Sequence, residues 1–168
     1  CGTAWHAALI GKFMIEELAR IPVELDLASE YRYRNPIAGP DTLLVAVSQS
    51  GETADTLAAL REGKQKGACA VSVCNTEGSS ISRESASTLY THAGPEIGVA
   101  STKCFTTQIV ALYLLAIHLG RRRGTLSVER AREHLHALLR LPKRVEEVLE
   151  LEGQVKAIAK KYAHARDF

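Results

Sequence analysis

The stretch LLVAVSQSGETADTLAAL at residues 43–60 decides the fold. It opens with five consecutive apolar residues, 43–47, a run typical of a strand that is buried on both faces of a parallel sheet. Serine, glutamine and glycine follow at once, and Leu57 and Leu60 then fit a helix that ends near Gly67. The stretch therefore predicts a buried strand, a turn rich in hydroxyl groups and a helix.

The same alternation continues on both sides of this stretch. A second fully apolar strand is predicted at residues 68–75 (ACAVSVCN) and a third, short strand at 87–93 (STLYTHA), with helices at 4–19 and about 102–119. Residues 23–28 (VELDLA) alternate apolar and charged side chains, as a half-buried edge strand does. Strands that alternate with helices need crossover connections and a mainly parallel sheet. The sequence therefore predicts an α/β fold, an αβα three-layer sandwich.

The domain boundary is predicted from the change of pattern near residue 126. The 168 residues suit one domain with a sizeable core, and beyond residue 126 only helical patterns occur. We therefore expect an α/β domain at 1–126 and a helical extension at 127–168. A helix opens the chain without a preceding strand, and ARDF at the end follows a helical pattern without a terminator. Both features favour a segment of a longer protein, with Cys1 as an internal residue.

Composition argues against several classes of function. A net charge of +2 provides no general field for holding nucleic acid, and no uncharged apolar stretch reaches the roughly 20 residues that span a bilayer. Residues 109–120 (IVALYLLAIHLG) are interpreted as part of a buried helix. The four cysteines have no Cys-x-x-Cys spacing and no histidine at a metal-ligand interval. We expect no metal, no other cofactor, no nucleic acid or membrane partner, and a reduced, cytoplasmic setting.

The hydroxyl-rich turn after the first buried strand is the candidate binding site. Ligands of parallel sheets bind at the carboxyl ends of strands, where the amides of the following helix favour anions. Ser48, Ser50 and Thr53 add hydroxyl donors, and Gly51 allows close approach of the backbone. Because neither the P-loop nor the Gly-x-Gly-x-x-Gly pattern is present, a phosphate monoester such as a sugar phosphate fits best. The alternative is that a serine merely caps the helix.

Two other hydroxyl-bearing clusters precede helices and could converge on the same turn, namely residues 1–3 (CGT) and 98–108 (GVASTKCFTTQ). No group of residues indicates a catalytic centre. Glu52 and Glu96 could each act as an acid or a base, but exposed carboxylates at helix starts are commoner. The sequence therefore indicates binding and no catalysis.

Residues 1–4 (CGTA), 48–60 (SQSGETADTLAAL) and 94–108 (GPEIGVASTKCFTTQ) together resemble the sugar isomerase (SIS) domain family. More narrowly, the chain is similar to the first of two isomerase subdomains in the glutamine:fructose-6-phosphate aminotransferases. The resemblance implies a flavodoxin-like fold that binds fructose 6-phosphate. It implies that the phosphate contacts Ser48, Gln49, Ser50 and Thr53, and that the sugar lies along Cys1, Gly2, Thr3, Val99 and Ser101. Ala4 departs from the family, in which a serine often stands at this position.

The resemblance also implies what such a segment lacks. In the family, the residues that isomerise the sugar lie in a second SIS subdomain, and a domain that releases ammonia from glutamine lies upstream. The implied whole protein makes glucosamine 6-phosphate for amino-sugar biosynthesis, is a homodimer, and uses no catalytic residue of this chain. Two alternatives remain open: a SIS domain that senses sugar phosphates for a regulatory module, and a phosphosugar isomerase complete in itself.

Overall fold

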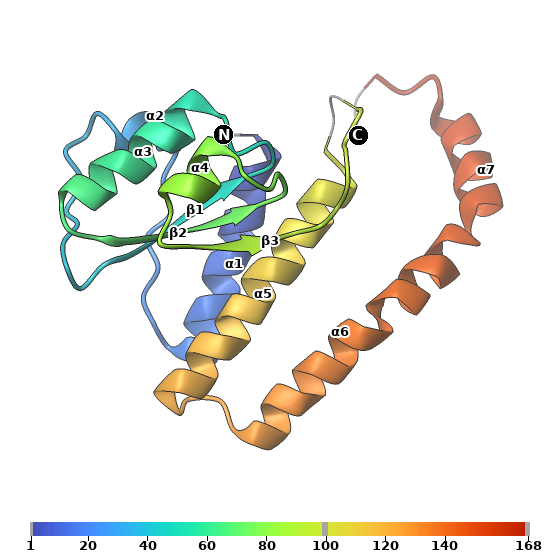
Figure 1. The fold of residues 1–168 in the computed structure, drawn as a ribbon. Coiled ribbons are helices and arrows are strands. Elements are labelled where there is room, and N and C mark those ends of the chain that lie inside the picture. The colour runs from blue at the N-terminus through green and yellow to red at the C-terminus, as the bar shows by residue number, and fades with distance from the viewer. Residues whose placement is uncertain (1, 99–100, 167–168) are drawn as a thin grey trace. The chain divides into compact units, whose positions relative to one another are not determined.

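The structure is a computed structural model that describes residues 2–98 and 101–166. It divides into two compact units, Cys1–Ser127 and Val128–Phe168 (Figure 1). The first unit contains the sheet and the helices packed on it. The second contains two helices.

The sheet of the first unit has three parallel strands in the order β1-β2-β3. The strands are β1 (Leu43–Ser48), β2 (Cys69–Cys74) and β3 (Ser87–Tyr90). β1 and β2 run in register from the pair Leu43 and Cys69 to the pair Ser48 and Cys74. Because the strands are parallel, their carboxyl ends meet at one edge of the sheet, and the turn predicted to bind phosphate follows β1 there.

Helices cover both faces of this sheet (Figure 1). One layer contains α1 (Thr3–Ala19) and α5 (Lys103–Arg123), and the other contains α3 (Ala54–Gln65) and α4 (Ser80–Glu84), with α2 (Ala28–Tyr31) beside α3. Alternate strand residues supply the two cores. Val45, Val47 and Val73 pack with α1 and α5, whereas Ala46 and Ala70 pack with α3 and α4. The predicted three-layer α/β fold with a parallel sheet is confirmed.

α5 is the central helix of the first layer. Among the described residues it is the one helix long and apolar enough, by length and composition alone, to cross a membrane. It packs against α1, and a Cβ atom at Gly11 of α1 would lie 2.9 Å from Leu112 Cδ1 of α5. The buried positions of α5 follow one face, from Cys104 and Gln108 to Gly120. These contacts identify α5 as a core helix.

The strand predicted at residues 23–28 is wrong. Residues 21–27 form a connection outside the sheet, which has three strands among the residues that the structure describes. The Val23 amide donates to Glu16 Oε1 at 3.1 Å, and the Val23 carbonyl accepts from Lys12 Nζ at 2.7 Å. Side chains of α1 thus bind the backbone groups that a strand would use to pair with its neighbour. The alternation of apolar and charged residues at 23–28 is therefore not sufficient to make a strand here.

The second unit consists of α6 (Val128–Leu149) and α7 (Glu152–Tyr162). Pro142 lies inside α6 and does not end it. Several apolar side chains on these helices are exposed, among them Leu139, Val148 and Leu149. Helices therefore make up most of the described residues of this unit.

Candidate functional site

The turn after β1 is held in place by hydrogen bonds from both sides. Within the turn, Ser48 Oγ accepts from the Gly51 amide at 3.0 Å. The Gly51 carbonyl accepts from the Ile81 amide at 3.0 Å, and the Gln49 carbonyl accepts from the Asn75 amide at 3.2 Å. Since residues 75 and 81 belong to the segment that follows β2, two strand ends together fix the shape of this turn.

Gly51 is required in the turn for two reasons. Its φ of +69° lies in the left-handed region, which favours glycine. A Cβ atom on this residue would also lie 2.1 Å from Ser79 Oγ and 2.8 Å from Cys74 Sγ. Position 51 therefore has no room for a side chain, which explains why the turn has a glycine there.

The serine and threonine side chains of the turn do not cap the helix that follows. Thr53 is the N-cap residue of α3, and no side-chain hydrogen bond caps this helix. Ser50 Oγ accepts from the Glu52 amide at 3.2 Å, before the helix begins. Among the described residues no acceptor contacts the backbone N–H groups of residues 54–56. The alternative that a serine merely caps α3 is therefore wrong, and the N–H groups of the first turn of α3 have no acceptor in the described part of the chain.

A cavity of about 260 Å³ lies beside this turn, at the carboxyl end of β1. Residues predicted from the sequence to bind the ligand form much of its wall: Thr3, Ser48, Gln49, Ser50, Thr53 and Ser101. Gly2 is the N-cap of α1 and does not line the cavity. Cys1 and Val99 lie outside the described residues. The first helical turns of α1 and α3 and the segment before α5 thus surround one cavity.

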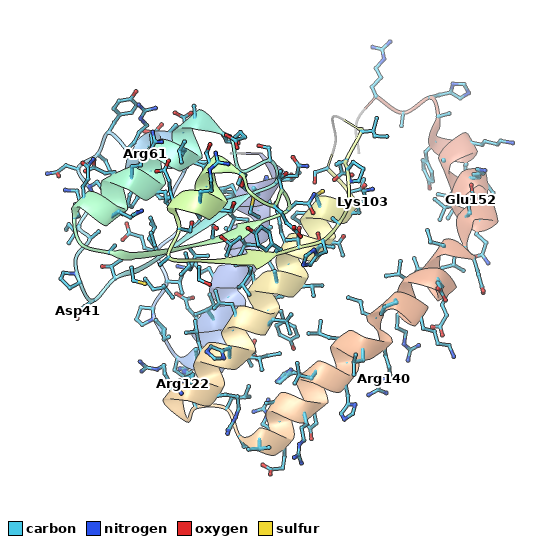
Figure 2. The ribbon with its side chains drawn as sticks, viewed as in Figure 1. Asp41, Arg61, Lys103, Arg122, Arg140 and Glu152 are labelled. Atoms are coloured by element: carbon cyan, nitrogen blue, oxygen red, sulfur yellow. The ribbon has the colours of Figure 1, made fainter. Side chains whose placement is uncertain are left out.

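Glu96 also lines the cavity, and its carboxylate contacts the start of α5. Its Oε2 accepts from the Thr102 amide at 3.3 Å and from the Cys104 amide at 3.2 Å, and its Oε1 accepts from Thr102 Oγ1 at 3.2 Å. Ser101 Oγ donates to the same carboxylate at 3.3 Å. The α5 N-terminus, marked by Lys103 in Figure 2, therefore already holds an anion that belongs to the chain itself.

These contacts keep Glu96 charged. The Cys104 thiol contributes most to lowering the pKa of Glu96, burial opposes it, and the Cys104 amide and both Thr102 donors add to it. The resulting pKa is about 2. Burial, followed by the hydrogen bond with Glu96, raises the pKa of the Cys104 thiol to about 11. The thiol is thus protonated at neutral pH and poorly suited to act as a nucleophile.

Glu52, the other carboxylate considered as an acid or base, has a structural contact. Its Oε1 accepts from the Ser80 amide at 2.7 Å at the start of α4. Hydrogen bonds from Ser80 lower the pKa of Glu52. Glu52 does not line the cavity. It therefore anchors the turn to α4.

Gln108 is a cavity residue that the sequence analysis did not select. It lies on α5 one turn after Cys104, on the same buried face, and its side chain is only 2% exposed. Its Oε1 is buried and has no hydrogen-bond partner among the described residues. The signal in the sequence was a lone amide among the apolar residues of a core helix, because such positions are rarely polar without a partner.

The chemistry of the cavity is that of a binding site. Hydroxyl groups and free amides lie on the α3 side, whereas the acceptors Glu96 and Gln108 Oε1 lie on the α5 side. No group of three or more metal-ligating side chains occurs among residues 2–98 and 101–166. The arrangement suits a small polar ligand with an anionic end and a hydroxyl-bearing end.

Relatives with established names match the whole length of the chain. The chain is 55% identical over 167 residues to glutamine-fructose-6-phosphate aminotransferase (isomerizing) from Clostridium tetani. It is 55% identical over 168 residues to the protein of the same name from Thermus thermophilus. The two matches cover 99% and 100% of the chain but only 28% of each relative. The chain thus spans less than a third of the length of these relatives.

A solved structure has the same fold. The C-terminal domain of glucosamine-fructose-6-phosphate aminotransferase from Francisella tularensis superposes with a TM-score of 0.93 at 37% sequence identity. The superposition covers 98% of this chain and 47% of that domain. The SIS domain family itself matches residues 1–118, which include the sheet, the turn after β1 and most of α5. The chain therefore belongs to the SIS domain family.

Proposed function

We propose that this chain is the fructose 6-phosphate-binding SIS subdomain of a glutamine:fructose-6-phosphate aminotransferase. Such an enzyme, also called glucosamine-6-phosphate synthase, makes glucosamine 6-phosphate from fructose 6-phosphate and glutamine. The relatives named above support the parent enzyme, and the SIS family supports a sugar phosphate as the ligand. The observation that carries the proposal is the cavity beside residues 48–53.

The phosphate binds at the α3 side of the cavity in this proposal. The N–H groups of residues 54–56 have no acceptor among the described residues, and the helix dipole adds partial positive charge there. Ser48, Ser50 and Thr53 line the same side and can donate their hydroxyl hydrogens. Of the described residues, no lysine or arginine lines the cavity, so the phosphate is held by neutral donors and the helix dipole. The sugar then extends toward Thr3 and Ser101 on the other walls.

The chain contributes binding and not the chemical steps. Glu96 is occupied by four donors, and the Cys104 thiol is protonated at neutral pH, so neither is a free acid or base. We infer that the residues that isomerise the sugar lie in a second SIS subdomain, and that a domain releasing ammonia from glutamine lies upstream. The helices of residues 127–168 lead toward that second subdomain, and the parent protein is a cytoplasmic homodimer.

The decisive experiment is calorimetric titration of the chain with fructose 6-phosphate and with fructose, together with an isomerisation assay on the same sample. Fructose 6-phosphate should bind and fructose should not, and no turnover should occur. If neither ligand binds, the proposed function of the cavity is wrong. If the sample turns the sugar over, the chain is a phosphosugar isomerase in its own right.

Replacing one hydroxyl of the turn tests the position of the phosphate. Ser50→Ala should weaken the binding of fructose 6-phosphate by about 1 to 3 kcal/mol, the usual cost of losing a hydrogen bond to a charged group. Ser87→Ala is the matched control, because Ser87 is exposed at the amino end of β3 and lies outside the cavity. Equal affinity of the two variants would contradict the placement of the phosphate at this turn.

A further inference from the structure

Gln108 carries one of two buried side-chain polar atoms that have no hydrogen-bond partner among the described residues, and the other is the Tyr31 hydroxyl. Gln108 Oε1 has no partner in the part of the chain that the structure describes, and the residue is only 2% exposed. A buried acceptor that forms no hydrogen bond destabilises the folded protein, and such groups are uncommon in native structures. Gln108 lines the cavity, so a turn of its side-chain amide brings Oε1 to the cavity surface, where a ligand can supply the missing donor.

The chemistry of the missing partner follows from the atom that is free. Oε1 of a glutamine side chain accepts hydrogen bonds and cannot donate them. A fully ionised phosphate offers acceptor oxygens only and would meet Oε1 with two acceptors facing each other. The hydroxyl groups of a sugar are donors and satisfy Oε1. A sugar hydroxyl therefore gives Oε1 a hydrogen-bond partner, whereas a phosphate leaves Oε1 without one.

Glu96 supports the same orientation from the same side of the cavity. Its carboxylate accepts from the Thr102 and Cys104 amides, so these two donors at the start of α5 are already used. Its negative charge, kept by a pKa of about 2, repels a phosphate. The α3 side has the opposite character, with free amides and three hydroxyl groups. The cavity therefore has a donor wall along the start of α3 and an acceptor wall formed by Glu96 and Gln108.

We propose that Gln108 is a substrate-binding residue whose Oε1 accepts a hydrogen bond from a hydroxyl group of the bound sugar phosphate. This inference rests on the proposed function, because it takes the ligand to be a sugar phosphate. The phosphate lies on the donor wall and the sugar hydroxyl on the acceptor wall. Gln108 thus determines which way round the ligand binds.

The variant Gln108→Met separates the two ends of the ligand. Methionine has a similar length and volume but no strong acceptor. The affinity for fructose 6-phosphate should fall roughly 5- to 150-fold, as expected for the loss of a buried hydrogen bond. Inorganic phosphate, tested as a competitor, should bind the variant and the wild type equally, since it occupies the donor wall alone. Gln65→Met on the exposed last turn of α3 is the matched control, and it should change neither affinity.

Thermal unfolding of the ligand-free proteins distinguishes binding from a structural role. Because Oε1 is unpartnered, Gln108→Met should unfold at the same temperature as the wild type or at a higher one. A lower unfolding temperature with equal losses for both ligands would show that Gln108 supports the fold, and the inference would be overturned. Unchanged affinity for fructose 6-phosphate would overturn it as well. Failure of the wild type to bind fructose 6-phosphate would instead refute the proposed function on which the inference rests.

Discussion

The starts of α3 and α5 lie at the same cavity but differ in what occupies them. At α5, the carboxylate of Glu96 accepts from the amides of Thr102 and Cys104. At α3, no side chain caps the helix, and the first-turn amides have no acceptor among the described residues. One helix start is therefore already neutralised by the chain, and the other is available to an anion from outside.

Serines and threonines before a helix are therefore not enough to identify an anion site. The segments before α3 and before α5 both carry hydroxyl residues, and both helices pack on the same sheet. The two helix starts differ by one carboxylate. Glu96, seven residues before Lys103 in the chain, contacts the start of α5, and no such group accepts from the start of α3 among the described residues. Substitutions at the start of α3 and at the start of α5 should therefore differ in their effects on stability and on binding.

The largest effect is expected at the donor wall, from Gly51→Ala. The new methyl group would meet Ser79 Oγ and Cys74 Sγ, and the residue would have to keep a φ of +69°. The free energy of unfolding should fall by about 2 to 5 kcal/mol, and phosphate-dependent binding should be lost. Urea denaturation followed by circular dichroism measures the first quantity.

Gly78→Ala is the control for this substitution. Gly78 has a similar φ of +67°, but nothing lies within 4 Å of a Cβ atom there. It should cost only the backbone strain, about 1 kcal/mol. Equal losses at the two glycines would show that the packing around Gly51 does not determine the shape of the turn.

An intermediate effect is expected at the acceptor wall, from the titration of Glu96. Its folded pKa of about 2 lies below the ordinary value of 4.5, so ionised Glu96 stabilises the folded state above pH 4.5. That contribution is lost as the pH falls through about 2. Glu96→Gln should therefore unfold at a lower temperature than the wild type at pH 6, and the difference should shrink as the pH falls below 4.5.

Calorimetric scans of both proteins between pH 6 and pH 2 measure this difference directly. Glu146→Gln, at an exposed position of α6, provides a carboxylate-to-amide change away from the cavity. A difference between wild type and Glu96→Gln that stays constant over the whole range would mean that the charge of Glu96 does not hold the α5 start.

The smallest effect on stability is expected from Thr53→Val, because Thr53 is an N-cap residue whose side chain makes no capping bond. Loss of an ordinary threonine cap costs about 0.5 to 2 kcal/mol. Here the free energy of unfolding should change by less than about 0.5 kcal/mol, while the affinity for fructose 6-phosphate falls. Denaturation and titration of the same preparation test both parts. A loss of stability without a loss of affinity would show instead that the Thr53 side chain acts as a helix cap of α3.

The sequence alone was sufficient for the features that are local along the chain. The apolar run at 43–47, the glycine at 51 and the helical pattern after it belong to one continuous stretch, so the strand, turn and helix could be predicted together. The hydroxyl clusters at residues 1–3 and 98–108 could converge on this turn, because each stands at the start of a helix that follows the parallel sheet. The structure places Thr3 and Ser101 of these clusters on the cavity wall.

The errors and omissions concern partners that are distant in the chain. Residues 23–28 have the alternation of a strand, but Lys12 and Glu16 bind the backbone of Val23. Glu96 was considered an exposed carboxylate, and its four hydrogen bonds depend on the path of the segment before α5. The lack of a partner for Gln108 can be recognised only when every neighbour of its side chain is known.

The sequence by itself therefore determined the order of the elements, the parallel sheet and the hydroxyl turn, because hydrophobic periodicity and turn residues act over a few consecutive positions. Only the tertiary structure decided which helix start is free and which is filled, and which buried acceptor has no partner. Hydrogen bonds form between groups brought within about 3 Å by folding, whatever their separation in sequence. The opposite characters of the α3 and α5 walls, and with them the orientation proposed for the ligand, belong to the folded chain.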